Sequence, residues 1–175
     1  MDNNTKEIVW NQLGASIDML INVIANCPDD YFHTHQRFYY IAYHSTLFLD
    51  YYATIPPKDF SPLLPFSQKE PEERPKEAID DLLPERKYSK HEMLEYLNLS
   101  REKCKQLIYT RNHQNSSERF TEGNEPNDMD YPMLEILLYN LRHTQHHVAQ
   151  LNMLLRQDSN RHMEWSFRVG DLSNE

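Results

Sequence analysis

Two histidines in the C-terminal half of the chain have the spacing of a bidentate metal clamp. His143 and His147 are four residues apart within the stretch 140–156, whose apolar positions recur at helical intervals. Side chains four residues apart lie on the same face of a helix, so both imidazoles can point toward one ion. Two ligands leave a divalent ion under-coordinated. His44, in the aromatic-rich stretch 41–52, can supply a third imidazole from a facing helix.

Three neutral imidazoles with one open coordination position make up the ligand set of many catalytic zinc sites. Each histidine also has a simpler interpretation. A single histidine on an apolar face, such as His44, is more often a hydrogen-bonded core residue, and the spacing of His143 and His147 also arises by chance. His146 is rotated by about 100° around the helix from His147 and is expected at the rim or on the surface. A His143/His146 pair remains an alternative.

Polar and sulfur-containing residues outside this group receive weaker assignments. Gln150, one turn beyond His147, could hold a ligand or substrate, or it could be a polar edge residue. Tyr139, one turn before His143, could orient a ligand or donate a proton, although a core tyrosine is the more common case. The remaining histidines are expected to be solvated: His33, His35, His91, His113 and His162. The two cysteines, Cys27 and Cys104, have no adjacent base and are expected to be buried small residues.

The elements that must position these histidines follow from the apolar periodicity. It predicts four helices at about residues 5–26, 37–54, 89–111 and 132–157. Pro132 suits the first turn of the fourth helix, Asp29 and Asp30 mark a turn, and the polar stretch 112–127 is expected to be a loop. The tail beyond Gln157 is expected to dock as an extended segment through apolar residues that alternate with polar or small ones: Met163, Trp165, Phe167 and Val169.

The stretch 55–88 carries seven of the ten prolines, which excludes a long helix. A chain of this length can return along a helix that is about 30 Å long, so the two helices that it joins can run parallel. Phe60, Leu63, Leu64 and Phe66 suggest that part of it packs over the helices, as a lid does. The prediction is an all-α four-helix bundle in a single domain, residues 1–175, with a long proline-rich crossover between the second and third helices.

Composition and missing motifs exclude several function classes. Lys and Arg total 18 against 27 for Asp and Glu, a formal net charge of -9, which disfavours nucleic acid and anionic membrane surfaces as partners. Glycine occurs only at 14, 123 and 170, so phosphate-binding glycine loops and nucleophile elbows are absent from the sequence. It also has no His-Glu-x-x-His run and no Glu-x-x-His pair of the di-iron type.

The cellular setting is predicted from the same composition. Two cysteines cannot build a disulfide-rich framework, and the first residues lack the basic and apolar regions of a signal peptide. Polar residues interrupt every apolar run before the roughly 20 residues that a membrane span requires. We therefore expect a soluble, cytoplasmic protein without a membrane partner.

The histidine-bearing runs resemble the DinB-like superfamily of metal-binding four-helix bundles. The residues that show the resemblance lie in the stretches 43–52, 143–150 and 154–156, and the resemblance extends over most of the chain. In the family, one histidine on the second helix and a His-x-x-x-His pair on the last helix bind a divalent metal, usually taken to be zinc or nickel. His44, His143 and His147 stand at those positions. Many members follow the last ligand with Arg-Gly-Gln, whereas this chain has Val148, Ala149 and Gln150 and so lacks the arginine.

The resemblance implies a homodimer and several possible activities. Characterised relatives include transferases and isomerases that use a low-molecular-weight thiol, with a metal-held thiolate as the nucleophile. We therefore expect a metal-dependent thiol S-transferase that acts on a small electrophile, with a thiolate or water on the metal as the reacting group. A metal-dependent hydrolase, or a non-catalytic dimeric protein with a structural metal site, is the alternative. A structural site would be closed by four protein ligands, whereas an enzyme needs an open position.

Overall fold

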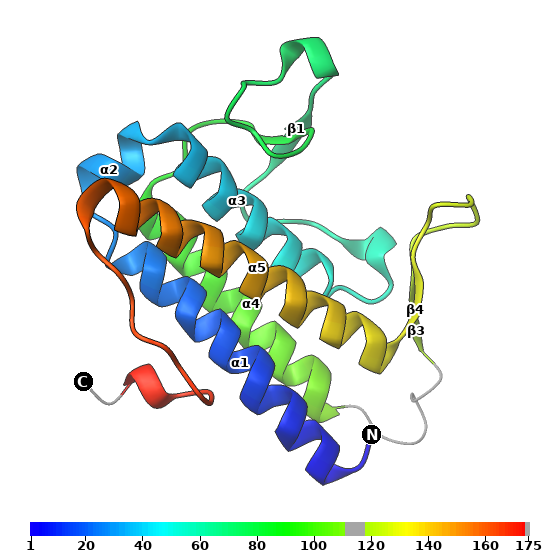
Figure 1. The fold of residues 1–175 in the computed structure, drawn as a ribbon. Helices are drawn as coiled ribbons and strands as arrows, with labels where there is room; N and C mark the ends of the chain where they lie inside the picture. The colour runs from blue at the N-terminus through cyan, green and yellow to red at the C-terminus, as the bar shows by residue number, and fades with distance from the viewer. Residues whose placement is uncertain (111–117, 174–175) are drawn as a thin grey trace.

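The computed structural model describes residues 1–110 and 118–173, and it is mostly helical with two small sheets (Figure 1). The long helices are α1 (Asn3–Ala25), α3 (Gln36–Tyr51), α4 (Lys90–Thr110) and α5 (Met133–Ser159). The short helical segments are α2 (Asp29–Thr34), η1 (Pro57–Asp59), η2 (Pro71–Glu73) and η3 (Asp171–Ser173). The antiparallel strand pairs are β1 (Phe66–Gln68) with β2 (Leu82–Pro84) and β3 (Arg119–Thr121) with β4 (Asp130–Pro132).

The four long helices pack around one apolar core. α1 contacts α4 and α5, and α3 contacts the same two helices. α3 and α4 begin at the same end of the molecule, while α1 and α5 run in the opposite direction (Figure 1). The chain between α3 and α4 contains η1, β1, η2 and β2. Fully buried apolar side chains from all four helices fill the centre, among them Leu13, Leu20, Leu47, Leu97 and Leu151.

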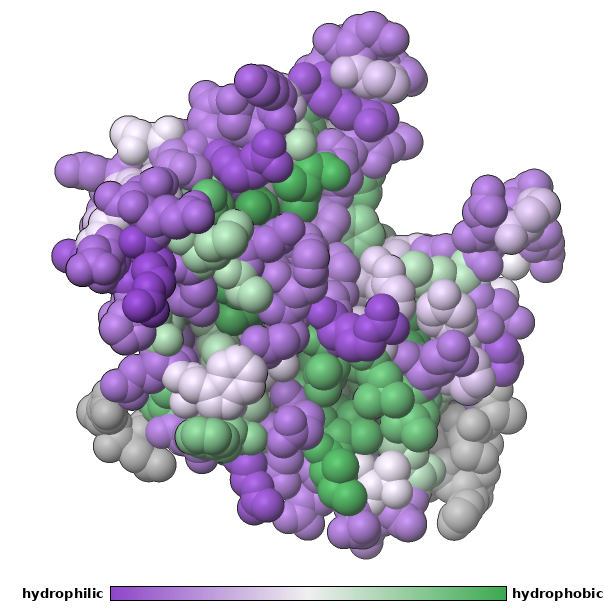
Figure 2. All heavy atoms as spheres, in the orientation of Figure 1, coloured by the Kyte–Doolittle hydropathy of each residue, from purple (hydrophilic) through white to green (hydrophobic). Residues whose placement is uncertain are grey.

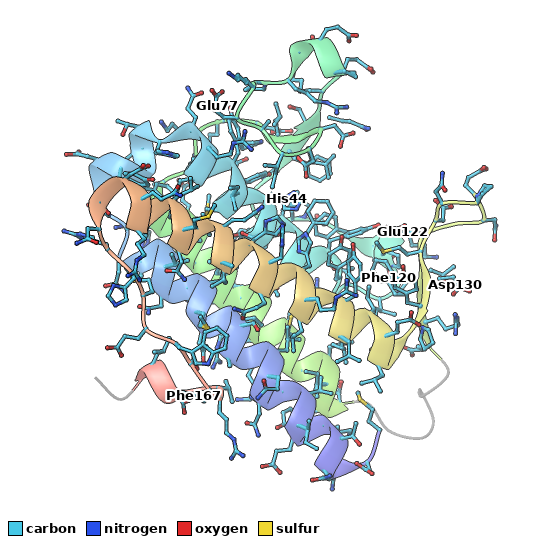
Figure 3. All side chains as sticks on the ribbon, in the orientation of Figure 1. His44, Glu77, Phe120, Glu122, Asp130 and Phe167 are labelled. Atoms are coloured by element: carbon cyan, nitrogen blue, oxygen red, sulfur yellow. The ribbon has the colours of Figure 1, made fainter. Side chains whose placement is uncertain are left out.

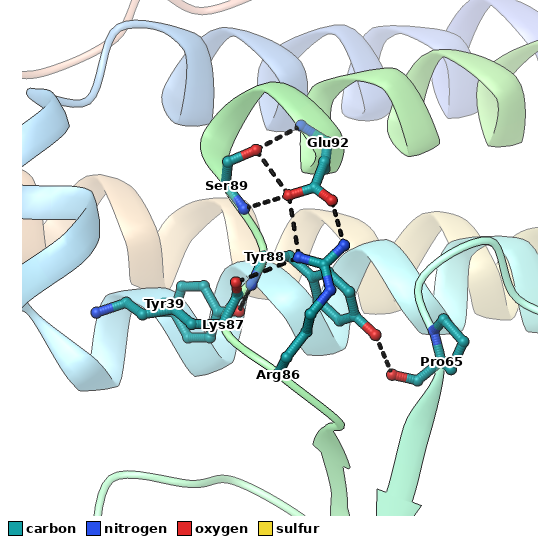
Figure 4. Close-up of polar contacts among 7 residues, drawn as sticks. All are labelled: Tyr39, Pro65, Arg86, Lys87, Tyr88, Ser89 and Glu92. Atoms are coloured by element: carbon teal, nitrogen blue, oxygen red, sulfur yellow. Dashed lines mark hydrogen bonds and ion pairs between the residues drawn. The ribbon is translucent and has the colours of Figure 1, made fainter.

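A capping box fixes the start of α4 (Figure 4). The Glu92 side chain accepts a hydrogen bond from the Ser89 backbone N–H at 2.8 Å, and the Ser89 hydroxyl accepts one from the Glu92 N–H at 3.2 Å. Arg86 and the Ser89 donors hold the pKa of Glu92 at about 2, well below its usual value. The preceding Tyr88 donates its N–H to the Tyr39 hydroxyl and its own hydroxyl to the Pro65 carbonyl, both at 2.8 Å. These bonds tie the proline-rich segment to α3 and α4.

Several local predictions were wrong in detail. The expected turn at Asp29 and Asp30 begins the short helix α2, because the chain can complete one helical turn before Gln36 starts α3. The expected loop 112–127 contains strand β3, whose partner strand β4 includes Pro132, so α5 begins one residue later. The part of that loop at 111–117 and the predicted solvated His113 lie outside the described residues.

The C-terminal tail docks on α1, but not through all the residues that its alternation predicts. The Val169 N–H donates to the Asn11 carbonyl at 3.1 Å, and a Cβ on Gly14 would lie 2.6 Å from the Val169 side chain. Glycine at this position therefore permits the close approach of the tail. Trp165 and Phe167 are 59% and 75% exposed, so they do not dock. The tail bends and turns at residues 167–170 before η3, so the alternation of an extended segment does not continue there.

Helix α1 is long and apolar enough, by length and composition, to cross a membrane. Its most apolar window has a mean hydropathy of 1.3, and 61% of that window is buried inside the protein. Apolar side chains also gather on the surface over the first halves of α1 and α5 (Figure 2), where Ile8 and Leu138 are about half exposed. A buried core helix of a water-soluble protein can have the same length and apolar composition, so these two properties are weak support for a membrane span.

Candidate metal site

Three imidazoles from two helices converge at one point. His44 lies on α3 (Figure 3). His143 and His147 lie one turn apart on α5. The His143 Nε2 lies 3.0 Å from the His44 Nε2 and 3.2 Å from the His147 Nε2. Three nitrogens that each bind one tetrahedral ion at about 2.0 to 2.1 Å would lie roughly 3.4 Å apart. The spacing is close to that value, and the group could hold a metal ion.

Partners on the outer side of two rings fix their tautomers. The His44 Nδ1 contacts the Asp80 Oδ2, and the His147 Nδ1 lies 2.8 Å from the Gln150 Oε1. Both oxygens accept hydrogen bonds, so each Nδ1 carries the proton and each Nε2 keeps its lone pair. Both lone pairs point toward the His143 Nε2. A cation at the centre would be bound by these lone pairs.

His143 lacks such a partner. Its Nδ1 is buried and accepts or donates no hydrogen bond within the described part of the chain. Burial, followed by repulsion from the His147 and His44 rings, lowers the pKa of His143 to about 3. Burial and the His44 ring lower the pKa of His147 to about 4. Both rings are therefore neutral at pH 7, which is the protonation state that binds a metal.

Aromatic rings surround the triad. The Phe48 ring centre lies 4.5 Å from that of His44 and 5.7 Å from that of His143. Tyr139 lies nearly parallel to His143, with ring centres 6.3 Å apart and planes at 13°. Tyr52 meets the same imidazole edge-on at 5.4 Å. Packing against these rings holds the His143 imidazole in place and leaves its buried Nδ1 without a hydrogen-bond partner among the described residues.

The described residues supply three ligands to this group. No fourth histidine, cysteine or carboxylate joins the group among the described residues, because Asp80 is engaged with the outer nitrogen of His44. A surface hollow of about 500 Å³ on the outer face of α5 includes His143 in its lining, with Tyr139, Arg142 and His146. Three protein ligands are the number typical of a catalytic zinc site, whereas a structural site usually has four.

The structure places the other sequence candidates as follows. Gln150 orients His147, and Tyr139 packs on His143. His146 is exposed and outside the converging group, although its ring lies edge-on to His147 at 5.1 Å. Burial raises the pKa of Cys27 to about 11 and that of Cys104 to about 12, so neither thiol is ionised at neutral pH.

Two residues have roles that the sequence did not predict. His35 was expected to be solvated, but its Nδ1 accepts the Phe38 N–H at 3.0 Å and caps α3, while its Nε2 lies 3.2 Å from Asp158. Asp80 contacts His44 from the proline-rich segment. In the sequence, the role of Asp80 was indicated only by its acidic side chain and by the length of its segment, which is sufficient to reach the triad.

Acid is expected to destabilise the metal-free protein. The pKa values of His143 and His147, about 3 and 4, lie below the unfolded value of 6.5. As the pH falls through 6.5, the unfolded chain takes up protons that the folded chain does not. The free energy of unfolding should fall by at most about 1.4 kcal/mol per pH unit for each ring between pH 6.5 and 4.

Denaturant titrations at several pH values, in the presence of a chelator, measure this slope. The double variant His143→Leu/His147→Leu is the matched control, because it removes both titrating rings and should flatten the profile between pH 6.5 and 4. An equally steep profile in that variant would contradict the assignment of the slope to these rings.

A comparison with protein-family models, curated proteins and solved structures finds no match for this chain.

Proposed function

We propose that this chain is a divalent-metal-binding protein of the DinB-like superfamily, folded as a four-helix bundle with a proline-rich crossover between α3 and α4. The contacts of α1 and α3 with both α4 and α5 support the bundle. The common starting end of α3 and α4 supports the crossover (Figure 1). The family assignment rests on the residue runs 43–52, 143–150 and 154–156 alone.

The proposed ligands are His44, His143 and His147, and the proposed metal is zinc or nickel. Imidazole nitrogens suit both ions, whereas the oxygen-rich sites of magnesium and calcium have a different donor set. The depressed pKa values of His143 and His147 favour metal binding, because protons compete weakly for these nitrogens at neutral pH. Gln150 would hold the His147 ring in its binding orientation.

The proposed reaction is the transfer of a low-molecular-weight thiol to a small electrophile. A divalent ion bound at an open site lowers the pKa of a thiol or water that reaches it. The chain's own residues would hold the ion and, through the rings of Phe48, Tyr52 and Tyr139, keep bulk water from the triad. The observation that carries the proposal is the convergence of three imidazoles with no fourth protein ligand among the described residues.

Metal analysis and a conjugation assay together test this proposal. The purified protein is loaded with zinc or nickel, and its metal content is compared with that of His44→Ala. Several thiols are then assayed with monobromobimane or chlorodinitrobenzene, with and without a chelator. The proposal expects one ion per chain in the unaltered protein, loss of the ion in the variant, and chelator-sensitive turnover with at least one thiol.

The outcomes separate the site from the reaction. Absence of metal from the loaded protein, or equal metal uptake by the unaltered protein and His44→Ala, would overturn the metal site. Bound metal without thiol conjugation would overturn the transferase assignment only. Chelator-sensitive hydrolysis of an activated ester in that case would favour the hydrolase alternative. A bound ion that exchanges no ligand would favour a structural role.

A further inference from the structure

Asp80 connects the triad to a part of the chain that lies outside the long helices. It sits in the turn before β2, within the hairpin formed by β1 and β2, here defined as residues 66–84. Its Oδ2 contacts the His44 Nδ1, and its Oδ1 accepts the Leu82 N–H at 3.1 Å. One carboxylate is therefore shared between a predicted metal ligand and the backbone of the hairpin.

The hairpin is anchored at its β1 side by hydroxyl groups. The Tyr43 hydroxyl lies 2.8 Å from the Leu64 carbonyl and 3.0 Å from the Pro65 carbonyl. The Tyr88 hydroxyl donates to the same Pro65 carbonyl at 2.8 Å. On the β2 side, the contact with α3 runs through Asp80 and the adjoining strand. The Asp80 contact is partly sheltered, since the His44 and Asp80 side chains are 13% and 21% exposed.

A carboxylate on the outer nitrogen of an imidazole strengthens metal binding at the inner nitrogen. It fixes the tautomer and the ring orientation, and it makes the inner nitrogen more basic. The effect is reciprocal, because a cation on the inner nitrogen makes the outer N–H a stronger donor to the carboxylate. Two binding events that strengthen each other in this way share a coupling free energy.

We propose that Asp80 is a positioning residue of the metal site and that it couples docking of the hairpin 66–84 to metal binding. This inference rests on the proposed metal binding by the triad and describes its regulation. The contrast with Gln150 supports it. Gln150 orients His147 from the same helix, three residues away, so that contact links no second segment to the site. His44, by contrast, is oriented by a residue of another segment, Asp80 of the hairpin.

Zinc affinity in matched variants tests the positioning role. Asp80→Ala removes the acceptor, Asp80→Asn keeps a neutral oxygen, and Asp81→Ala is the control. Asp81 is the adjacent carboxylate in the same hairpin, where it accepts from the Gln68 side chain at 2.8 Å. Competition with a chromophoric chelator should give about 10- to 100-fold weaker zinc binding for Asp80→Ala. Asp80→Asn should lie between this variant and the unaltered protein, and Asp81→Ala should match the unaltered protein.

Amide hydrogen exchange tests the coupling. In the unaltered protein, zinc should slow exchange in β1 and β2, whereas in Asp80→Ala zinc should leave exchange in those strands unchanged. Exchange in the buried stretches of α1 and α4 reports whether each variant keeps its fold, and Asp80→Asn provides the milder test if Asp80→Ala unfolds.

The failure of this inference is distinct from the failure of the proposed function. Equal zinc affinities for Asp80→Ala and Asp81→Ala, in a protein that binds zinc, would overturn the positioning role and leave the function standing. Zinc-slowed exchange of β1 and β2 in Asp80→Ala would overturn the coupling. Absence of zinc uptake by the unaltered protein would overturn both the proposed function and the inference that rests on it.

Discussion

Replacement of His143 by alanine is expected to abolish metal binding. His143 is the central residue of the triad, with its Nε2 at 3.0 Å from that of His44 and 3.2 Å from that of His147. Without it, the two remaining imidazoles come from different helices and leave half of a tetrahedral ion's ligands to solvent. Elemental analysis should find one zinc ion per chain in the unaltered protein after zinc loading. In the variant, the zinc content should equal that of the buffer.

The same variant should have little effect on stability when the metal is absent. Truncation of a buried ring leaves a cavity that costs about 2 to 3 kcal/mol. It also removes the partnerless Nδ1 of His143, whose burial costs about 1 to 3 kcal/mol. The two effects nearly cancel. With free zinc at about 1,000 times its dissociation constant, the unaltered protein gains about 4 kcal/mol that the variant cannot gain.

Denaturant unfolding with zinc and with chelator measures both quantities, and His146→Ala is the matched control. His146 is an exposed histidine on the same helix, outside the converging group. His146→Ala should therefore keep full zinc uptake and the full zinc-dependent gain in stability. If His143→Ala retained zinc while His146→Ala lost it, the assignment of the ligands would be wrong.

The triad was predictable because regular helical geometry determines it. His143 and His147 are four residues apart, so any helix through them presents both on one face. His44 lies on a second apolar periodicity, and two helices that bury their apolar faces against each other bring such residues together. The apolar periodicity of the two helices therefore predicts that these three residues can meet, while their selection as ligands also rested on the resemblance of the runs 43–52 and 143–150 to the DinB-like superfamily.

Asp80 was not predictable in the same way. It lies in a segment rich in proline, where no periodicity relates one residue to a surface. Its position depends on the hydroxyl anchors of Tyr43 and Tyr88 and on the pairing of β1 with β2. Each of these contacts joins residues that are distant in sequence. The cap formed by His35 was missed for a related reason, since only the structure shows that its ring turns toward the Phe38 N–H.

A second large effect is expected at Asp50, a buried carboxylate between α3 and α4. Asp50 is 6% exposed and accepts a hydrogen bond from the Tyr96 hydroxyl at 2.7 Å. It also forms an ion pair with Lys103, whose ammonium group lies 2.5 Å from the Thr54 hydroxyl. Asp50→Ala leaves the Tyr96 hydroxyl without its acceptor and deprives the ammonium group of its carboxylate partner, so that the Thr54 hydroxyl is its remaining side-chain acceptor. The free energy of unfolding should fall by about 2 to 4 kcal/mol, as measured by denaturant unfolding of the metal-free protein.

Asp30→Ala is the control for this variant, since Asp30 is an exposed carboxylate in the first turn of α2. Its loss should change the free energy of unfolding by no more than about 0.5 kcal/mol. Tyr96→Phe should cost less than Asp50→Ala, because Lys103 still pairs with the carboxylate. The double variant should then cost less than the sum of the two, since Tyr96 and Asp50 share one hydrogen bond. Strictly additive costs, or an Asp50→Ala cost no larger than that of Asp30→Ala, would show that this buried carboxylate does not hold α3 and α4 together.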